Sequence, residues 1–298
     1  MVANIVGNYL IENQLLTTEQ LRDLVREQRK VRVKLGLIAV AEGLMTQEET
    51  DKVNRLQTVM DKRFGDIAVE KGYLTHGQVE ALLKKQGNAY LAFAQALENQ
   101  GLMSIEQLEQ YMIDYQGDHH MTFSDIDDLK SDDVDRILHL YMPIGGEKYI
   151  NAVGTAVRTI MRCVDVDVYP EKAYLADWCE ADNGAIQFVE SEHSFTCALA
   201  GKEQALLETA SVFGQEEFPE VNMDALDAIG ELLNCINGLY ATALSQGGIS
   251  TELYPPEFSD QIKGIKCEKM LVIPLHVLGQ EISLAVAVDH KINLEQEA

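Results

Sequence analysis

The sequence predicts an α+β protein in which an all-helical repeat domain precedes a mixed domain with an antiparallel sheet and one long helix. Three observations predict this class. At 298 residues the chain is long enough for two domains. Glycines, hydroxyl residues and glutamines recur every 29 residues in its first third, which is typical of stacked helical units. The remainder mixes helical periodicity with short apolar or alternating segments that are typical of strands.

Four 29-residue units occupy residues 1–117, which we expect to form one domain. Each unit reads as a short helix, a glycine turn and a second helix that begins at a hydroxyl residue. Glycine suits the positive φ angle that ends a helix, and a hydroxyl residue followed three positions later by Gln or Glu forms a capping box. The turn glycines are Gly43, Gly72 and Gly101, and the capping pairs are Thr17–Gln20, Thr46–Glu49, Thr75–Gln78 and Ser104–Gln107.

Two segments within these units, residues 34–57 and 63–86, are each 24 residues long and are separated by residues 58–62. They begin Lys34-Leu35-Gly36 and Arg63-Phe64-Gly65 and end in Gln57 and Gln86. This pattern resembles the N-terminal domain of type II secretion and type IV pilus ATPases, one branch of which binds cyclic di-GMP. The resemblance implies nucleotide-binding residues at Lys34, Gly36, Gln57, Arg63, Gly65 and Gln86.

Lys34 stands where the nucleotide-binding pattern has Arg, and an ammonium lacks the planar, bidentate contacts that a guanidinium makes with phosphate and guanine. A structural or protein-docking repeat is therefore the favoured interpretation, and cyclic di-GMP binding is the alternative. No Walker loop accompanies the resemblance, so no ATPase activity is expected.

Residues 118–146 are expected to be an acidic connector with one amphipathic helix. The adjacent His119 and His120 lack the i, i+4 spacing that lets two imidazoles on a helix converge on a metal, so we expect no metal site. Charge-rich stretches of this kind are usually solvated.

Residues 147–298 are expected to form an α+β domain. Apolar residues at helical spacing predict its helices, and alternating or continuous apolar segments predict its strands. We expect helices at 148–163, 202–212 and 223–245, strands at 164–168, 186–189 and 195–199, and a final hairpin of 270–277 and 281–288 that turns at Leu278-Gly279.

The most informative motif lies on the long helix at 223–245. Asp227, Glu231 and Asn234 are spaced i, i+4 and i+7, which places them on one stripe, and Pro256 follows Asn234 by 22 positions. This arrangement resembles the CheC/CheX family of chemotaxis phosphatases, which dephosphorylate the response regulator CheY. That family's pattern is an acidic residue or Ser, three residues, Glu, two residues, Asn, and a Pro about 22 positions later.

The resemblance implies a protein aspartyl-phosphate phosphatase with a regulatory or targeting module at its N-terminal end. In the family reading Asn234 enters the site of a CheY-like receiver and orients the attacking water, and Glu231 pairs with the receiver's Lys. Asp227 and Pro256 support the helix or the docking. Mg2+ is expected in the receiver, and no cofactor in the phosphatase itself. One motif helix favours a CheX-like single site, and the alternative is a non-catalytic adaptor that binds a receiver, cyclic di-GMP or both.

Charge and composition limit the other partners. The formal net charge is −24, with 13 basic and 16 acidic residues in 1–116 against 11 and 32 in 117–298. Such an acidic surface repels nucleic-acid phosphates, so nucleic acid is not expected as a partner. No apolar run reaches the length of a membrane span, and the five cysteines are widely spaced, so we expect a cytoplasmic protein with reduced thiols and no membrane insertion. A homodimer is left open.

Overall fold

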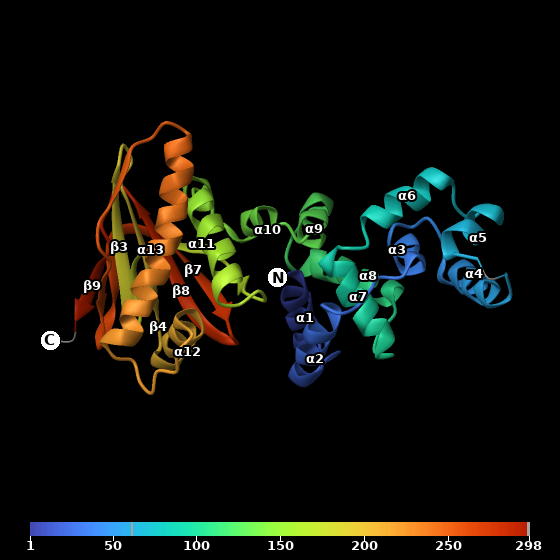
Figure 1. Ribbon diagram of the computed structural model, residues 1–298, viewed down its shortest axis with the longest axis horizontal. Coiled ribbons are helices and arrows are strands. Elements are labelled where there is room, and N and C mark those ends of the chain that lie inside the picture. Colours follow the sequence, from blue (N-terminus) through green and yellow to red (C-terminus); the bar gives the residue numbers. More distant parts are fainter. Residues whose placement is uncertain (61, 297–298) are drawn as a thin grey trace. The chain divides into compact units, whose positions relative to one another are not determined.

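The computed structural model describes residues 1–60 and 62–296, so residue 61 of the expected spacer and residues 297–298 lie outside the described residues. The chain divides into two compact units (Figure 1). The helical unit is Val2–Asp133, and the C-terminal unit begins at Val134. The fold class is α+β, as predicted.

The helical unit consists of helix pairs, one pair for each 29-residue period, followed by one further helix. A tight turn ends the first helix of each pair, and the second helix begins a few residues later. The helices are α1 (Val2–Glu12), α2 (Thr18–Gln28), α3 (Leu35–Ala41), α4 (Gln47–Met60), α5 (Phe64–Glu70), α6 (His76–Lys84), α7 (Ala89–Asn99), α8 (Ile105–Asp118) and α9 (Phe123–Lys130).

Hydrogen bonds at the helix starts confirm the predicted capping boxes. At the start of α6 the hydroxyl of Thr75 accepts from the backbone N–H of Gln78 at 3.2 Å. The backbone N–H of Thr75 in turn donates to Gln78 Oε1 at 2.8 Å. The same reciprocal bonds form at Thr17, Thr46 and Ser104. Each cap satisfies N–H groups that have no partner within the helix.

Glycines serve two purposes in the helical unit. Gly43, Gly72 and Gly101 follow the first helix of a pair and have φ values of +64°, +75° and +67°. Residues with a Cβ adopt such φ values only at an energetic cost. Glycines inside the first helix allow close packing on the second. A Cβ on Gly36 would lie 2.4 Å from Thr50 Cγ2, and one on Gly65 would lie 2.8 Å from Val79 Cγ1.

The segment 118–146 contains two helices, where the sequence suggested one. The hydroxyl of Thr122 caps α9 by accepting from the N–H of Asp125, and Asp132 then adopts a left-handed φ of +56° that separates α9 from α10 (Val134–Tyr141). Ile137 and Leu138 of α10 are fully buried in the C-terminal unit. α10 therefore belongs structurally to the second unit.

The C-terminal unit packs helices against one antiparallel sheet. A short 3-10 helix, η1 (Glu147–Tyr149), leads into its first long helix. The remaining elements are α11 (Ile150–Cys163), β1 (Tyr169–Pro170), β2 (Tyr174–Glu180), β3 (Asn183–Ser191), β4 (Phe195–Gly201), α12 (Glu203–Gly214), α13 (Met223–Gln246), β5 (Thr251–Leu253), β6 (Glu257–Ser259), β7 (Ile262–Val277), β8 (Gln280–Val288) and β9 (Asn293–Gln296).

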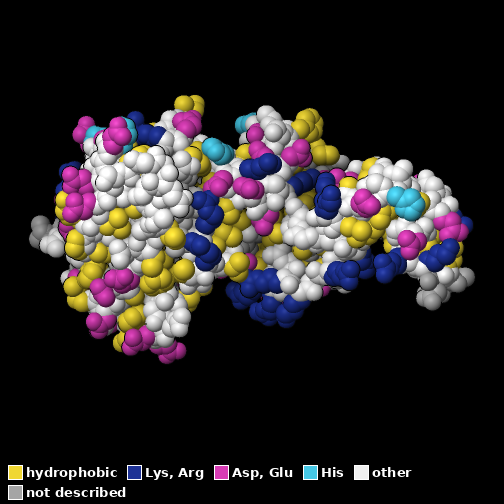
Figure 2. Space-filling view, turned by 45° about the horizontal axis from the view of Figure 1, so that its top comes forward, with side chains coloured by type: hydrophobic (Ala, Val, Ile, Leu, Met, Phe, Trp, Pro, Cys, Tyr) yellow, Lys and Arg dark blue, Asp and Glu magenta, His cyan; other side chains and the backbone are white. Residues whose placement is uncertain are grey.

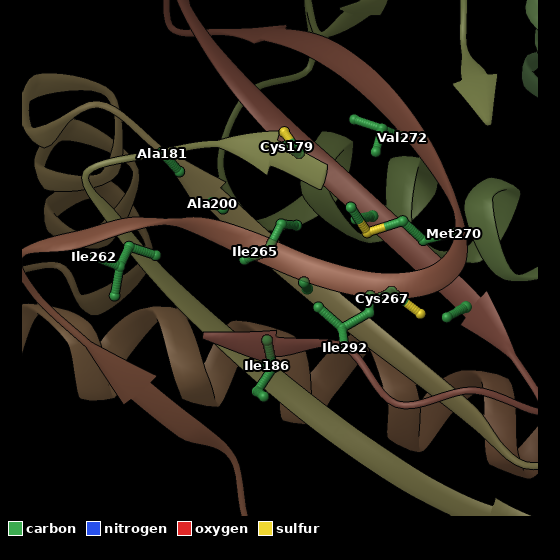
Figure 3. Packing of buried hydrophobic residues seen from close by; sticks show 13 residues of the cluster. Cys179, Ala181, Ile186, Ala200, Ile262, Ile265, Cys267, Met270, Val272 and Ile292 are labelled. Atoms are coloured by element: carbon green, nitrogen blue, oxygen red, sulfur yellow. The ribbon is translucent and has the colours of Figure 1, made fainter. Parts of the chain in front are cut away.

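Strand order in this sheet is β1-β7-β8-β4-β3-β5, with β2 and β9 also paired to β7 and β6 paired to β3. The predicted final hairpin is confirmed, because β7 and β8 pair from Leu271 opposite Val286 to Val277 opposite Gln280. The first half of β7 was missed. It pairs with β2 and β9, and it curves over the apolar cluster in Figure 3.

The two faces of the sheet are covered differently. Helices α11, α12 and α13 pack on one face (Figure 1). On the other face a cluster of apolar side chains fills the space beneath the first half of β7 (Figure 3). Ile186 of β3 belongs to this cluster, and the next residue, Gln187, faces the helices because successive strand residues point to opposite faces.

The expected strand at 164–168 is wrong. This segment is a turn between α11 and β1. Asp165 Oδ1 accepts from the backbone N–H of Asp167 at 2.9 Å, and Asp165 Oδ2 accepts from the N–H of Leu278 at 2.7 Å. An aspartate that bonds the backbone two residues later favours a turn, and this overrides the alternating pattern.

Side-chain charge is distributed unevenly on the face that Figure 2 shows. In Figure 2, Lys and Arg side chains gather on the helical unit, and carboxylates are spread over the C-terminal unit. Among the described residues, no helix combines the length and apolar character needed to cross a bilayer.

Candidate active site

The motif residues lie on the exposed stripe of α13. The side chain of Asn222 caps this helix by accepting from the N–H of Ala225 at 2.9 Å. Asp227, Glu231 and Asn234 are exposed. The opposite side of α13 is buried against the sheet through Leu226, Ile229, Leu233 and Ile236. The predicted division of the helix into a packed and a presented face is therefore confirmed.

A buried glutamine on β3 holds the carboxamide of Asn234. Gln187 Nε2 donates to Asn234 Oδ1 at 3.0 Å and to the backbone carbonyl of Tyr254 at 2.9 Å. Gln187 Oε1 accepts from Asn237 Nδ2 at 2.8 Å. Gln187 and Asn237 are each 1% exposed. Asn234 Nδ2 lies 3.5 Å from Glu231 Oε2, a long contact at the surface.

Pro256 lies where the chain between β5 and β6 meets α13. A Cβ on Gly230 would be 3.2 Å from Pro256 Cβ and 3.3 Å from Phe258 Cδ1. Gly230 therefore allows this segment to approach the helix between Asp227 and Glu231. The same segment carries Tyr254, whose carbonyl contacts Gln187. Of the four residues predicted for the phosphatase site, three share the stripe, and Pro256 packs against the helix from its side.

Two ionisable groups beside the stripe favour their neutral forms. Burial raises the pKa of the Cys235 thiol, and the neighbouring Cys163 and Glu231 add to the effect. The hydrogen bond from the Tyr254 hydroxyl to Glu190, at 2.8 Å, raises the pKa of that tyrosine. Both shifts favour the protonated, uncharged thiol and phenol. The chemistry that this face can offer is hydrogen bonding from a carboxamide beside a carboxylate.

The glycines and glutamines of the two 24-residue segments have packing or hydrogen-bonding roles inside the helical unit. Gly36 and Gly65 are buried, and Lys34 and Arg63 are exposed at the starts of α3 and α5. Gln86 Nε2 donates to the carbonyl of Val33 at 2.8 Å. Gln57 Nε2 donates to the carbonyl of Lys62 at 3.4 Å.

One group of described side chains could hold a metal ion, although none was expected from the sequence. The ligand atoms of Glu171, His276 and Glu281 lie within 4.8 Å of one another. His276 Nε2 is 2.6 Å from Glu171 Oε1, and its ring stacks on Tyr169 at 4.5 Å. These residues sit at the turn end of the β7–β8 hairpin and include no member of the α13 stripe.

The stripe, the amide network and Pro256 all fall within one stretch of the C-terminal unit. Residues 183–276 match the family described as chemotaxis phosphatase CheX. The C-terminal half of the chain thus carries a CheX domain. A search of the curated proteins finds no match.

Solved structures similar to the CheX domain have low sequence identity. CheX from Desulfovibrio desulfuricans is 16% identical, with a TM-score of 0.42 over 48% of this chain and 99% of that chain. CheX from Vibrio vulnificus is 14% identical, with a TM-score of 0.40 over 46% of this chain and 96% of that chain. A chain of the CheX–CheY–BeF3–Mg2+ complex from Borrelia burgdorferi is 16% identical, with a TM-score of 0.37 over 46% of this chain and 95% of that chain. The family assignment rests on the match over residues 183–276.

Sequence reasoning missed three contributors to the candidate site of the CheX domain. Gln187 and Asn237 were not recognised as partners of the motif, nor was the carbonyl of Tyr254. The available signal was Gln187 itself, a polar residue within the apolar strand segment 185–189. A buried amide requires hydrogen-bond partners, so its presence predicts a polar contact with whatever covers the strand.

Proposed function

We propose that the C-terminal unit hydrolyses the aspartyl phosphate of a CheY-like receiver, with Asn234 and Glu231 as the residues that enter the receiver's site. One observation carries the proposal. Within the CheX match, an exposed carboxamide and an exposed carboxylate stand side by side on a rigid helix, and the carboxamide is held from the buried side.

The reaction needs little from the phosphatase except position. Water adds to phosphorus, the bond from phosphorus to the aspartyl oxygen breaks, and the products are a carboxylate and dihydrogen phosphate, so both protons of the water remain on the phosphate. A phosphorylated receiver supplies its own Mg2+, and the phosphatase contributes alignment of the water. Asn234 aligns this water through hydrogen bonds. Glu231 pairs with a lysine of the receiver and fixes the orientation of the complex.

Replacing Asn234 by Ala tests the proposal. We expect phosphate release from a phosphorylated CheY-like receiver to fall by about 10²-fold, the typical effect of losing one positioned group. Gln246→Ala is the matched control, because Gln246 is an exposed residue at the end of the same helix and outside the motif. Equal rates for wild type and Asn234→Ala would remove the proposed role.

For the helical unit we propose a targeting or regulatory role through protein docking. The support is structural, because Gly36 and Gly65 serve helix packing and Gln86 binds a backbone carbonyl within the unit. These contacts account for motif positions that nucleotide binding would otherwise explain. A non-catalytic adaptor that binds a receiver, cyclic di-GMP or both stays the alternative.

A further inference from the structure

We infer that Gln187 is a positioning residue for the hydrolysis, because it sets which edge of the Asn234 carboxamide faces the receiver. This inference rests on the proposed function and names a residue outside the Asp227-Glu231-Asn234 motif. Gln187 lies beneath α13 on β3 and is 1% exposed, so it can affect the receiver only through the groups that it contacts, of which Asn234 alone is exposed on the motif stripe.

The orientation of all three amides follows from one backbone carbonyl. A carbonyl oxygen can only accept, so the carbonyl of Tyr254, 2.9 Å away, requires the NH2 group of Gln187 on its side. The second hydrogen of that NH2 group then points at Asn234, which must present its oxygen at 3.0 Å. Gln187 Oε1 faces Asn237 and requires a donor there, which Asn237 Nδ2 supplies at 2.8 Å. Reversing any one amide would place two donors or two acceptors together.

The outer edge of Asn234 is thereby defined. Its Oδ1 uses one of two lone pairs on Gln187, and its Nδ2 is turned towards Glu231 Oε2, 3.5 Å away, and towards the exterior. A water molecule at this edge meets an N–H donor next to the remaining lone pair of Oδ1. Without Gln187 the carboxamide can reverse, and a water held by the reversed group is displaced from the line of attack. Misplacement of about 1 Å costs roughly 10²-fold in such reactions.

Gln187→Met tests the inference, because methionine has a similar length and no hydrogen-bonding amide. We expect kcat for receiver dephosphorylation to fall at least tenfold while KM stays within about twofold, since the docking groups on α13 are unchanged. Thr196→Val is the matched control. Thr196 is also 1% exposed, on the neighbouring strand β4, and its hydroxyl donates to the carbonyl of His290 at 3.1 Å. This variant loses a buried hydrogen bond away from α13, and we expect its kcat to stay within twofold of wild type.

Two further measurements separate positioning from simple damage. Adding Gln187→Met to Asn234→Ala should lower the rate by less than twofold beyond Asn234→Ala alone, because Gln187 acts through Asn234. The Asn234 side-chain NH2 signals in a proton–nitrogen NMR spectrum should show one ordered amide in wild type and exchange-broadened or averaged signals in Gln187→Met.

Each outcome decides the inference. A Gln187→Met protein that keeps kcat within twofold, an equal loss in Thr196→Val, or an undiminished loss on the Asn234→Ala background would overturn it. If wild-type protein does not dephosphorylate a phosphorylated receiver, the proposed function fails. The NMR comparison still decides whether Gln187 orders Asn234, because that readout requires no receiver.

Discussion

Asn237 gives the most direct test of the amide network, because replacing it by Ala removes one buried donor and leaves the exposed stripe intact. Its Nδ2 donates to Gln187 Oε1 at 2.8 Å, and both side chains are 1% exposed. In Asn237→Ala the oxygen of Gln187 stays buried without this donor. A buried group left unsatisfied costs about 1–3 kcal/mol.

A comparison with Asn234→Ala isolates this cost. Both changes replace Asn by Ala inside α13, which favours the helix by roughly 0.5–0.7 kcal/mol in each case. Asn234 is exposed, so water can replace the oxygen that it offers to Gln187. The gain in helix propensity is the same in both variants and cancels, so we expect Asn237→Ala to be less stable than Asn234→Ala by about 1–3 kcal/mol. In a unit of this size that corresponds to a Tm roughly 2–12 °C lower.

The assay is urea unfolding followed by tryptophan fluorescence. Trp178 is the single tryptophan of the chain and lies on β2, paired with β7, so its signal reports the C-terminal unit. Unchanged slopes of free energy against urea would show that the midpoints report stability. Equal midpoints for the two variants would refute the reasoning, because they would mean that solvent reaches Gln187 as easily as it reaches Asn234.

Two further predictions concern pH and salt. Burial and a 2.7 Å hydrogen bond to Asp118 raise the pKa of Tyr9 from 10 to about 12. The neutral form of Tyr9 therefore stabilises the folded helical unit, and this stabilisation is lost as the pH rises from about 10 to 12. Circular dichroism should show a smaller loss of stability over this pH range in Tyr9→Phe than in wild type. If Glu231 docks on the receiver through charge, as proposed, the KM of dephosphorylation should rise with salt at unchanged kcat, because the Debye screening length falls from about 10 Å at 0.1 M to about 3 Å at 1 M salt. A truncation that begins at Val134 and keeps α10 should show the same dependence, and a salt-independent KM would contradict charge-based docking.

Local rules explain which parts of the fold the sequence could predict. A capping box or a left-handed glycine depends on residues within a few positions, so Thr75 and Gly72 identify a helix start and a turn before any tertiary contact is known. The presented stripe of α13 is also local, because i, i+4 and i+7 positions share a face in any helix. The first half of β7 escaped prediction since its charged residues, Lys266, Glu268 and Lys269, interrupt the apolar pattern.

The candidate site divides in the same way. The motif residues follow from spacing, whereas Gln187 is 47 positions from Asn234, 50 from Asn237 and 67 from Tyr254. Such contacts depend on which strand lies under the helix, and this is decided by the pairing of β3 with β4 and β5. Propensity and periodicity carry no information about that pairing beyond the existence of the strands.

Two occurrences of one pattern show why the supporting residues matter as much as the motif. Glu180 and Asn183 have the same spacing as Glu231 and Asn234. The first pair spans the turn from β2 to β3, where Asn183 is 6% exposed and its backbone pairs with Gly201. The second pair lies on a helix, where one buried glutamine fixes the amide and leaves its outer edge to solvent. A carboxamide can position water only when its own orientation is fixed, so the proposed chemistry depends on the helix together with the strand beneath it.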